Sequence, residues 1–125
     1  MDGLSYFFSA LQNGQRAKKS TIHVPYSKLA NTLLEIFSKE KYIQSYQIQG
    51  QAITVTLKYE GDSPMFEQIK RISRPGRRVY CSAANVPADK FTIVSTSKGM
   101  MAGREAHSFN VGGELICEVL VAKTV

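Results

Sequence analysis

The sequence predicts an α+β fold of two small lobes, an amino-terminal α-β-α-β-β lobe and a carboxy-terminal lobe that is mostly β with one short helix. Two apolar stripes at helical spacing and alternating apolar strands occupy the first half, whereas glycine and proline divide the second half into short strands. Hydrophobic residues make up 43% of the 125 residues, which excludes a disordered chain. The turn-forming stretch 60–64 separates the lobes, giving 1–62 and 63–125.

The amino-terminal lobe begins with a predicted helix, because Leu, Phe, Phe and Leu stand at positions 4, 7, 8 and 11. We expect Asn13-Gly14 to end this helix and residues 15–19 to form a basic connection. The first residues lack the basic flank of a signal or transit peptide, so we expect neither. A short strand over residues 21–24 follows.

A second helix and a hairpin complete this lobe. Ser27 is expected to cap the helix, whose apolar stripe is Leu29, Leu33, Ile36 and Phe37. Strands over residues 43–48 and 53–59 flank Gly50-Gln51, a pair that suits a tight hairpin. One face of the second strand is predicted to carry Ile53, Val55, Leu57 and Tyr59.

The carboxy-terminal lobe is predicted to contain short strands and one helix. Pro75-Gly76 fits the centre of a type II turn, because proline fixes φ and glycine accepts a positive φ. The expected elements are a strand over 66–73, a strand resuming at 79–80, a strand over 91–95, a loop over 96–99, a helix over 100–107 and a last strand over 114–121. Gly112-Gly113 should break the chain before the last strand.

The charge points to an acidic partner. The net charge is +6, and residues 63–125 carry nine basic and five acidic residues, against seven and five in residues 1–62. Every arginine except Arg16 lies in the second half, and arginine binds phosphate and stacks on bases well. This distribution favours nucleic acid, while a role in solubility alone remains open.

Other classes of site have little support in the sequence. Cys81 and Cys117 are far apart, so we expect free, mostly buried thiols and no disulfide framework. His23 and His107 complete no metal pattern with them. We therefore expect no metal, no cofactor and no small-molecule substrate. No apolar run is long enough to span a membrane.

Two segments of the carboxy-terminal lobe could contact RNA. The first, residues 70–80, places basic side chains around the tight turn and ends in Tyr80, which could stack on a base. The second is Ser95-Thr96-Ser97-Lys98-Gly99, whose hydroxyls suit base edges and 2′-hydroxyls, with the start of the following helix adding N–H groups. The alternatives are a solvated charge run with a core tyrosine and a capping turn.

The serine-rich segment also spells Ser-x-x-Lys, the nucleophile motif of serine β-lactamases. That chemistry needs the serine at the start of a helix and two further motifs, Ser-Asp-Asn and Lys-Thr-Gly, which are absent. We therefore expect no catalysis. A third candidate is Gly112-Gly113-Glu114, where glycine permits close backbone approach and Glu114 could accept from base amino groups or hold a basic residue in place. A plain entry turn is the equal alternative.

Taken together, these segments resemble one family, small-subunit ribosomal protein eight. The matching motifs are Asn13-Gly14-Gln15, Pro25-x-Ser27-Lys28-Leu29, Leu57-Lys58-Tyr59, Arg71-x-Ser73-Arg74-Pro75-Gly76-x-Arg78-x-Tyr80, Val94-Ser95-Thr96-Ser97-Lys98-Gly99 and Gly112-Gly113-Glu114-Leu115-Ile116-Cys117. They occur in the family's order and spacing over essentially the whole chain.

The resemblance implies a structural protein that binds an irregular helix in the central domain of small-subunit rRNA and supports subunit assembly. The implied partners are that rRNA and neighbouring ribosomal proteins, and the carboxy-terminal lobe makes the main contact. The implied core RNA contacts are Ser95, Thr96, Ser97, Lys98, Gly99, Gly112, Gly113 and Glu114. Tyr80, Arg74 and Arg78 would support them, and Asn13, Arg16 and Lys18 would touch rRNA from the other lobe. Apart from the resemblance, we expect Arg77 in the basic turn mostly to supply charge.

The sequence also departs from the bacterial pattern of that family. Ala10 and Gln12 stand where arginines are usual, Gly3 replaces a proline, and His107 replaces a common arginine. The loss of the arginines at positions 10 and 12 removes positive charge that the amino-terminal rRNA contacts of the family would use. The departures favour a mitochondrial ribosome, with a bacterial cytoplasm or a plastid as the alternatives.

Overall fold

The computed structural model describes residues 3–61, 63–86 and 90–120, which form two compact units. The amino-terminal unit extends to Glu67, and the carboxy-terminal unit spans Gln68–Leu120. The sequence placed the division between residues 62 and 63. The later division follows from Phe66, which is buried and packs on Phe37 and Tyr42 with ring centroids 6.3 and 6.5 Å apart.

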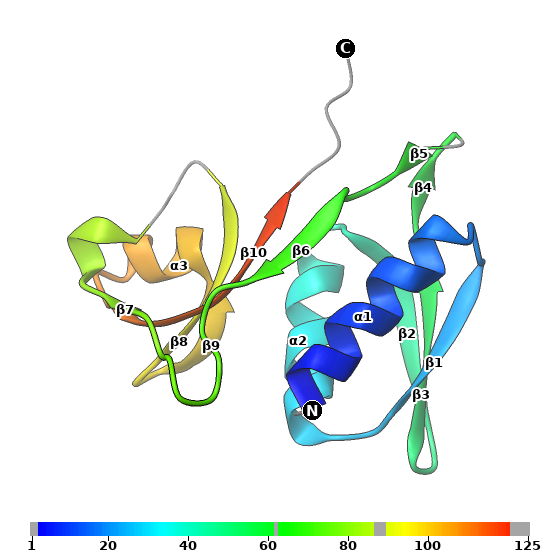
Figure 1. Cartoon of the computed structure of the whole chain (residues 1–125), viewed down its shortest axis with the longest axis horizontal. Helices are drawn as coiled ribbons and strands as arrows, with labels where there is room; N and C mark the ends of the chain where they lie inside the picture. Colours follow the sequence, from blue (N-terminus) through cyan, green and yellow to red (C-terminus); the bar gives the residue numbers. More distant parts are fainter. Residues whose placement is uncertain (1–2, 62, 87–89, 121–125) are drawn as a thin grey trace. The chain divides into compact units, whose positions relative to one another are not determined.

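The amino-terminal unit has the predicted α-β-α-β-β order, and two short strands that were not predicted follow it (Figure 1). Its elements are α1 (Gly3–Arg16), β1 (Thr21–Pro25), α2 (Lys28–Lys39), β2 (Ile43–Gln49), β3 (Ala52–Leu57), β4 (Tyr59–Glu60) and β5 (Ser63–Pro64). The first three strands form an antiparallel sheet in the order β1-β3-β2, and both helices cover one face of it (Figure 1). Neither helix, nor any other helix in the described ranges, is long and apolar enough to cross a membrane.

The core of this unit lies between the helices and the sheet. Alternate residues of β3 are buried, as the sequence predicted, because side chains on a strand point to opposite faces in turn. The turn at Gly50-Gln51 joins β2 to β3, and Gly50 has a φ of 65°, so the predicted hairpin is confirmed. Ser27 caps α2 by accepting a hydrogen bond from the Ala30 amide at 3.0 Å, also as predicted.

Two details of the helices differ from the prediction. Asn13-Gly14 does not end α1, which continues to Arg16 and is followed by Lys18 at a φ of 55°. Gly14 is instead a packing residue, because a Cβ there would lie 2.6 Å from Ile22 Cγ2. In α2 the buried stripe is Ala30, Leu33, Leu34 and Phe37, so Leu29 and Ile36 lie beside it.

The carboxy-terminal unit is mostly β with one short α-helix, as predicted (Figure 1). Its elements are β6 (Gln68–Arg71), β7 (Tyr80–Cys81), the 3-10 turn η1 (Ala83–Asn85), β8 (Phe91–Thr96), β9 (Gly99–Ala102), α3 (Gly103–Ser108) and β10 (Gly113–Leu120). Four strands follow the order β6-β10-β8-β9, and β7 also pairs with β10. Helix α3 packs on this sheet through a cluster that includes Val94, Met101 and Ala106.

Several segments near the unit boundary and in the second half were predicted incorrectly. Three residues of the expected linker, Glu60, Ser63 and Pro64, belong to a small ribbon in which β4 pairs with β5. The expected strand 66–73 is shorter, since only Gln68–Arg71 is extended and paired. The expected helix 100–107 begins later, at Gly103, because the residues before it form β9 against β8. The last strand begins at Gly113, and the end predicted for it, residue 121, lies outside the described residues.

Both cysteines are free thiols in different environments, Cys81 half-buried and Cys117 fully buried on β10. Burial raises the pKa of Cys117 to about 12, against smaller opposite effects of the Ile93 backbone and the Arg71 charge. The folded chain therefore keeps this proton where an unfolded thiol, with a pKa of about 8.5, loses it. This thiol's contribution to stability is complete below the unfolded pKa and is lost as the pH rises through the folded value.

We predict that Cys117 does not react with a thiol reagent in the native protein at pH 8, because only a thiolate attacks and this thiol stays protonated. A disulfide reagent with a coloured product should show one fast thiol per chain, Cys81, and a second after denaturation. The control is Cys81→Ser, in which the native protein should show no fast phase. A fast phase in that variant would contradict the assignment.

Candidate nucleic-acid interface

The first residues of β10 bring several predicted RNA contacts together. Glu114 lies directly opposite Ser95 on β8 and opposite Tyr80 on β7, while Gly113 lies opposite Cys81. Tyr80 is 67% exposed, so the alternative of a core tyrosine is wrong. A hydroxyl, a carboxylate and an exposed aromatic ring therefore converge at the beginning of one strand.

Gly112 and Gly113 make this convergence possible. A Cβ on Gly113 would lie 2.1 Å from the Ser95 carbonyl oxygen, and one on Gly112 would lie 2.4 Å from the Cys81 carbonyl oxygen. No side chain larger than hydrogen fits at these distances. The close approach that these glycines permit is made to the backbone of the chain itself, which gives them a structural role; their contact with RNA stays a prediction.

The serine-rich segment forms the tight turn of the β8–β9 hairpin, with Thr96 paired to Gly99. The Thr96 hydroxyl donates to the Gly99 carbonyl at 2.8 Å and accepts from the Lys98 amide at 3.0 Å. Thr96 therefore has a structural role, which is to close the turn. Ser97 is exposed at the tip, and its hydroxyl has no partner among the residues that the structure describes.

Two expectations for this segment are corrected by the turn. No helix follows it directly, since β9 intervenes before α3, and the predicted N–H groups of a helix start are not beside it. Ser95 lies within β8, whereas the Ser-x-x-Lys chemistry needs a serine at the start of a helix. This position does not match the geometry of a Ser-x-x-Lys nucleophile.

The basic segment between β6 and β7 is a type II turn, as predicted. Arg74 and Arg77 exchange two backbone hydrogen bonds of 2.9 Å, and Gly76 has a φ of 85°. Both arms of the segment are attached to β10. The Ile72 amide donates to the Ile116 carbonyl at 3.0 Å, and the Leu115 amide donates to the Val79 carbonyl at 2.9 Å.

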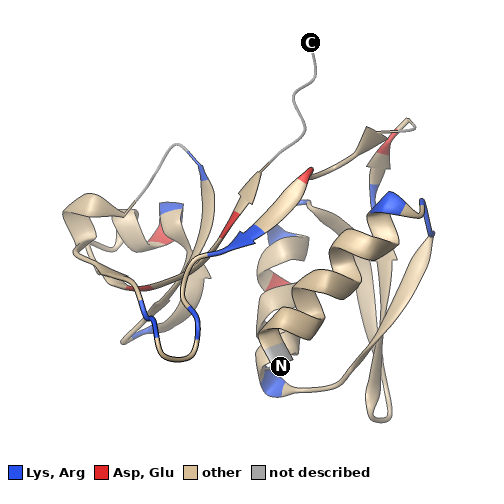
Figure 2. Cartoon of the chain, in the orientation of Figure 1, with Lys and Arg blue, Asp and Glu red and all other residues tan. Residues whose placement is uncertain are grey.

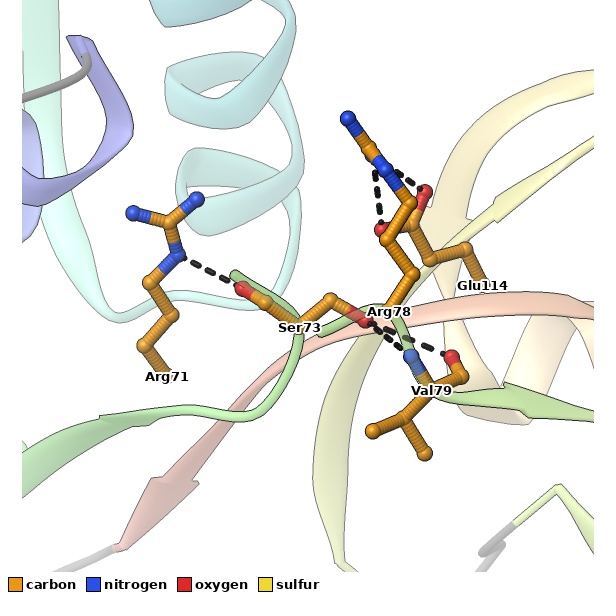
Figure 3. Close-up of polar contacts among 5 residues, drawn as sticks. All are labelled: Arg71, Ser73, Arg78, Val79 and Glu114. Atoms are coloured by element: carbon orange, nitrogen blue, oxygen red, sulfur yellow. Dashed lines mark hydrogen bonds and ion pairs between the residues drawn. The ribbon is translucent and has the colours of Figure 1, made fainter. Parts of the chain in front are cut away.

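Ser73 joins the two arms of this turn (Figure 3). Its buried hydroxyl accepts from the Val79 amide at 2.9 Å and donates to the Val79 carbonyl at 3.3 Å. The Ser73 carbonyl accepts a hydrogen bond of 2.7 Å from Nε of Arg71. The serine in the middle of the basic run therefore has a structural role, which is to hold the turn closed.

Glu114 and Arg78 contact each other (Figure 3). Nη1 of Arg78 lies 3.1 and 3.3 Å from the two carboxylate oxygens of Glu114. The glutamate is the more buried partner, with 15% of its side chain exposed against 57% for the arginine. This geometry matches the expectation that Glu114 holds a basic residue in place. The other guanidinium nitrogens of Arg78 have no partner among the described residues and can bind phosphate.

A basic groove lies beside the turn, with a volume of about 540 Å³. Its lining residues are Lys70, Arg71, Ile72, Arg74, Arg77, Val79 and Glu118. Lys90 lies 3.4 Å from the Glu118 carboxylate and offsets its charge, which leaves the groove strongly positive. Figure 2 shows basic residues on both arms of this turn. Lys70 and Arg71 were not among the individual residues expected to contact RNA, although both lie in the basic segment 70–80 that the sequence singled out.

The remaining predicted contacts belong to the amino-terminal unit. Asn13 lines a separate groove of about 510 Å³ between α1 and β1, together with Lys19 and His23. Arg16 and Lys18 are exposed at the end of α1 and just after it. Within the described ranges, no group of three or more histidines, cysteines or acidic residues could hold a metal ion.

Comparisons with known proteins agree with the resemblance. The family model described as ribosomal protein S8 matches residues 2–120. A protein of Alcanivorax borkumensis named small ribosomal subunit protein uS8 is 42% identical, over 94% of this chain and 96% of its own length. Proteins with the same name from Dictyoglomus thermophilum and Neisseria meningitidis serogroup C are 39% and 38% identical over the same shares of both chains.

We predict that Ser73→Ala lowers the free energy of unfolding by about 1–3 kcal/mol, because the Val79 amide is left without its acceptor. The measurement is urea denaturation followed by circular dichroism. The matched control is Ser97→Ala, an exposed serine without a partner among the described residues, which should change stability by less than about 0.5 kcal/mol. Equal stability of the two variants would show that Ser73 does not hold the turn.

Proposed function

Since the chain belongs to the ribosomal protein S8 family, we propose that it is a structural constituent of the small ribosomal subunit that binds an irregular helix of rRNA. The observation that carries the proposal is the convergence at the beginning of β10, where Ser95, Tyr80 and Glu114 meet. By resemblance to its family, the target helix lies in the central domain of the rRNA. Binding there would support subunit assembly and translation alongside neighbouring ribosomal proteins.

The carboxy-terminal unit divides the work of binding between cations and hydroxyls. Arg74 and Arg77, with Lys70 in the same groove, neutralise phosphates, which gives affinity without reading sequence. Ser97 and the groups around Glu114 reach base edges and 2′-hydroxyls, which differ from one RNA site to another. Asn13, Arg16 and Lys18 supply a second contact from the amino-terminal unit.

The proposed role is binding without chemistry. Ser95 lies on a strand, and the two motifs that accompany a Ser-x-x-Lys nucleophile are absent from the sequence. Turnover of an ester or amide that disappears in Ser95→Ala would contradict this part of the proposal.

The cellular compartment of the ribosome that carries this chain is a further part of the proposal. Ala10, Gln12 and His107 depart from the bacterial pattern and favour a mitochondrial ribosome, whereas the three relatives reported above are bacterial proteins and favour a bacterial cytoplasm. A plastid ribosome fits the same observations. The measurement is to separate small ribosomal subunits from each compartment on a sucrose gradient. The compartment whose subunits contain this chain is the correct one.

We predict opposite defects for Ser97→Ala and Arg77→Ala when each is titrated with the cognate rRNA helix and with a scrambled helix over several salt concentrations. Loss of the Ser97 hydroxyl should weaken only cognate binding, by about 1–3 kcal/mol by analogy with base readout, and leave the salt dependence intact. Loss of Arg77 should weaken both RNAs alike and lower the salt slope by about one unit.

The starting protein is the control in this titration. If its affinity for RNA did not change with salt concentration, the proposed phosphate contacts would be wrong. An unchanged cognate-to-scrambled ratio in a folded Ser97→Ala variant would mean that the hairpin turn is structural only. The absence of any RNA binding would favour a protein–protein adaptor.

A further inference from the structure

An exposed phenylalanine lies at the end of α3, a position at which no sequence motif predicted a contact. Phe109 is 57% exposed, although phenylalanine is usually buried in a protein of this size. Tyr80 is the other large exposed aromatic residue among those described in this unit, and it already faces the candidate interface.

The backbone around Phe109 is firmly held, so the ring is presented from a fixed position. The Phe109 amide donates to the Glu105 carbonyl at 2.9 Å, and the Val111 amide donates to the carbonyl of the fully buried Ala106 at 3.0 Å. Between them Asn110 turns the chain with a φ of 57°. A rigid support of this kind lowers the entropy lost when a partner binds.

Phe109 is also next to the serine-rich turn. Nζ of Lys98 lies 5.5 Å from the centre of the Phe109 ring, within the range of a cation–π contact. Lys98 follows Ser97 at the tip of the β8–β9 hairpin. The ring, a full positive charge and an unpartnered hydroxyl are thus neighbours on one surface.

We propose that Phe109 is a stacking platform for an unpaired base of the bound RNA, with Lys98 neutralising the phosphate of the same nucleotide. This inference rests on the proposed rRNA binding and adds to it a specificity-determining residue. An aromatic face accepts any unpaired base, and an irregular RNA helix can offer one, whereas a regular duplex keeps its bases stacked inside. The nearby ammonium favours a polyanion over an apolar protein surface as the occupant.

The test compares Phe109→Leu and Phe109→Tyr in the full chain, titrated with a transcript of the cognate small-subunit rRNA and with a perfectly paired RNA duplex. Phe109→Leu keeps an apolar side chain but removes the aromatic face, so it should bind the rRNA about tenfold more weakly. Phe109→Tyr keeps the ring and should bind like the starting protein. Neither variant should change binding to the paired duplex.

The matched control is Tyr26→Leu, which removes another exposed ring, 45% exposed, outside the carboxy-terminal unit and should leave both affinities unchanged. Unfolding midpoints equal to that of the starting protein establish that the variants are folded. If the starting protein binds the rRNA and Phe109→Leu binds it equally well, the inference is overturned. The same holds if Phe109→Leu weakens binding to both RNAs alike. Failure of the starting protein to bind rRNA would instead contradict the proposed function.

Discussion

The carboxy-terminal unit depends on the backbone contact that Gly112 and Gly113 make at the beginning of β10. Because neither residue has a side chain, β10 can approach the backbones of Ser95 and Cys81 closely enough to form its pairs with β8 and β7. A β-bulge between Leu115 and Cys117 then changes the register, and the backbone at the bulge is hydrogen-bonded to both arms of the type II turn between β6 and β7. One strand thereby positions the hydroxyls and the cations together.

This arrangement explains why the polar residues of the candidate interface have different roles. The hydroxyls of Ser73 and Thr96 each close a turn, and Glu114 pairs with Arg78. Ser97, Arg74 and Arg77 are exposed and have no hydrogen-bonded side-chain partner among the described residues, so they are available to the proposed RNA. Rigid turns that present a few unsatisfied groups suit RNA recognition, because ordering entropy is lost during folding and little is lost on binding.

The sequence predicted the parts of the fold that follow from local pattern. The alternation of apolar and polar residues correctly predicted the buried face of β3. The preference of glycine for a positive φ correctly predicted the turns at Gly50 and Gly76. The prediction from sequence was wrong where tertiary contacts determine the structure. Gly14 packs against Ile22 and does not end α1, and the residues before α3 form a strand that pairs with β8. The candidate RNA contacts were inferred from motifs and stay a prediction. The exposure of Phe109 depends on the folded unit and could not be predicted from its neighbours in sequence.

The most direct test of the glycine contact is the rRNA selectivity of Gly113→Ala, measured beside Gly76→Ala. A Cβ at Gly113 meets the Ser95 carbonyl, whereas one at Gly76, at a φ of 85°, meets nothing within 4 Å and adds only backbone strain. We expect Gly113→Ala to lose its preference for the cognate helix or to fail to fold its carboxy-terminal unit. We expect Gly76→Ala to stay folded and to keep that preference. A Gly113→Ala protein with the stability and selectivity of the starting chain would contradict the account.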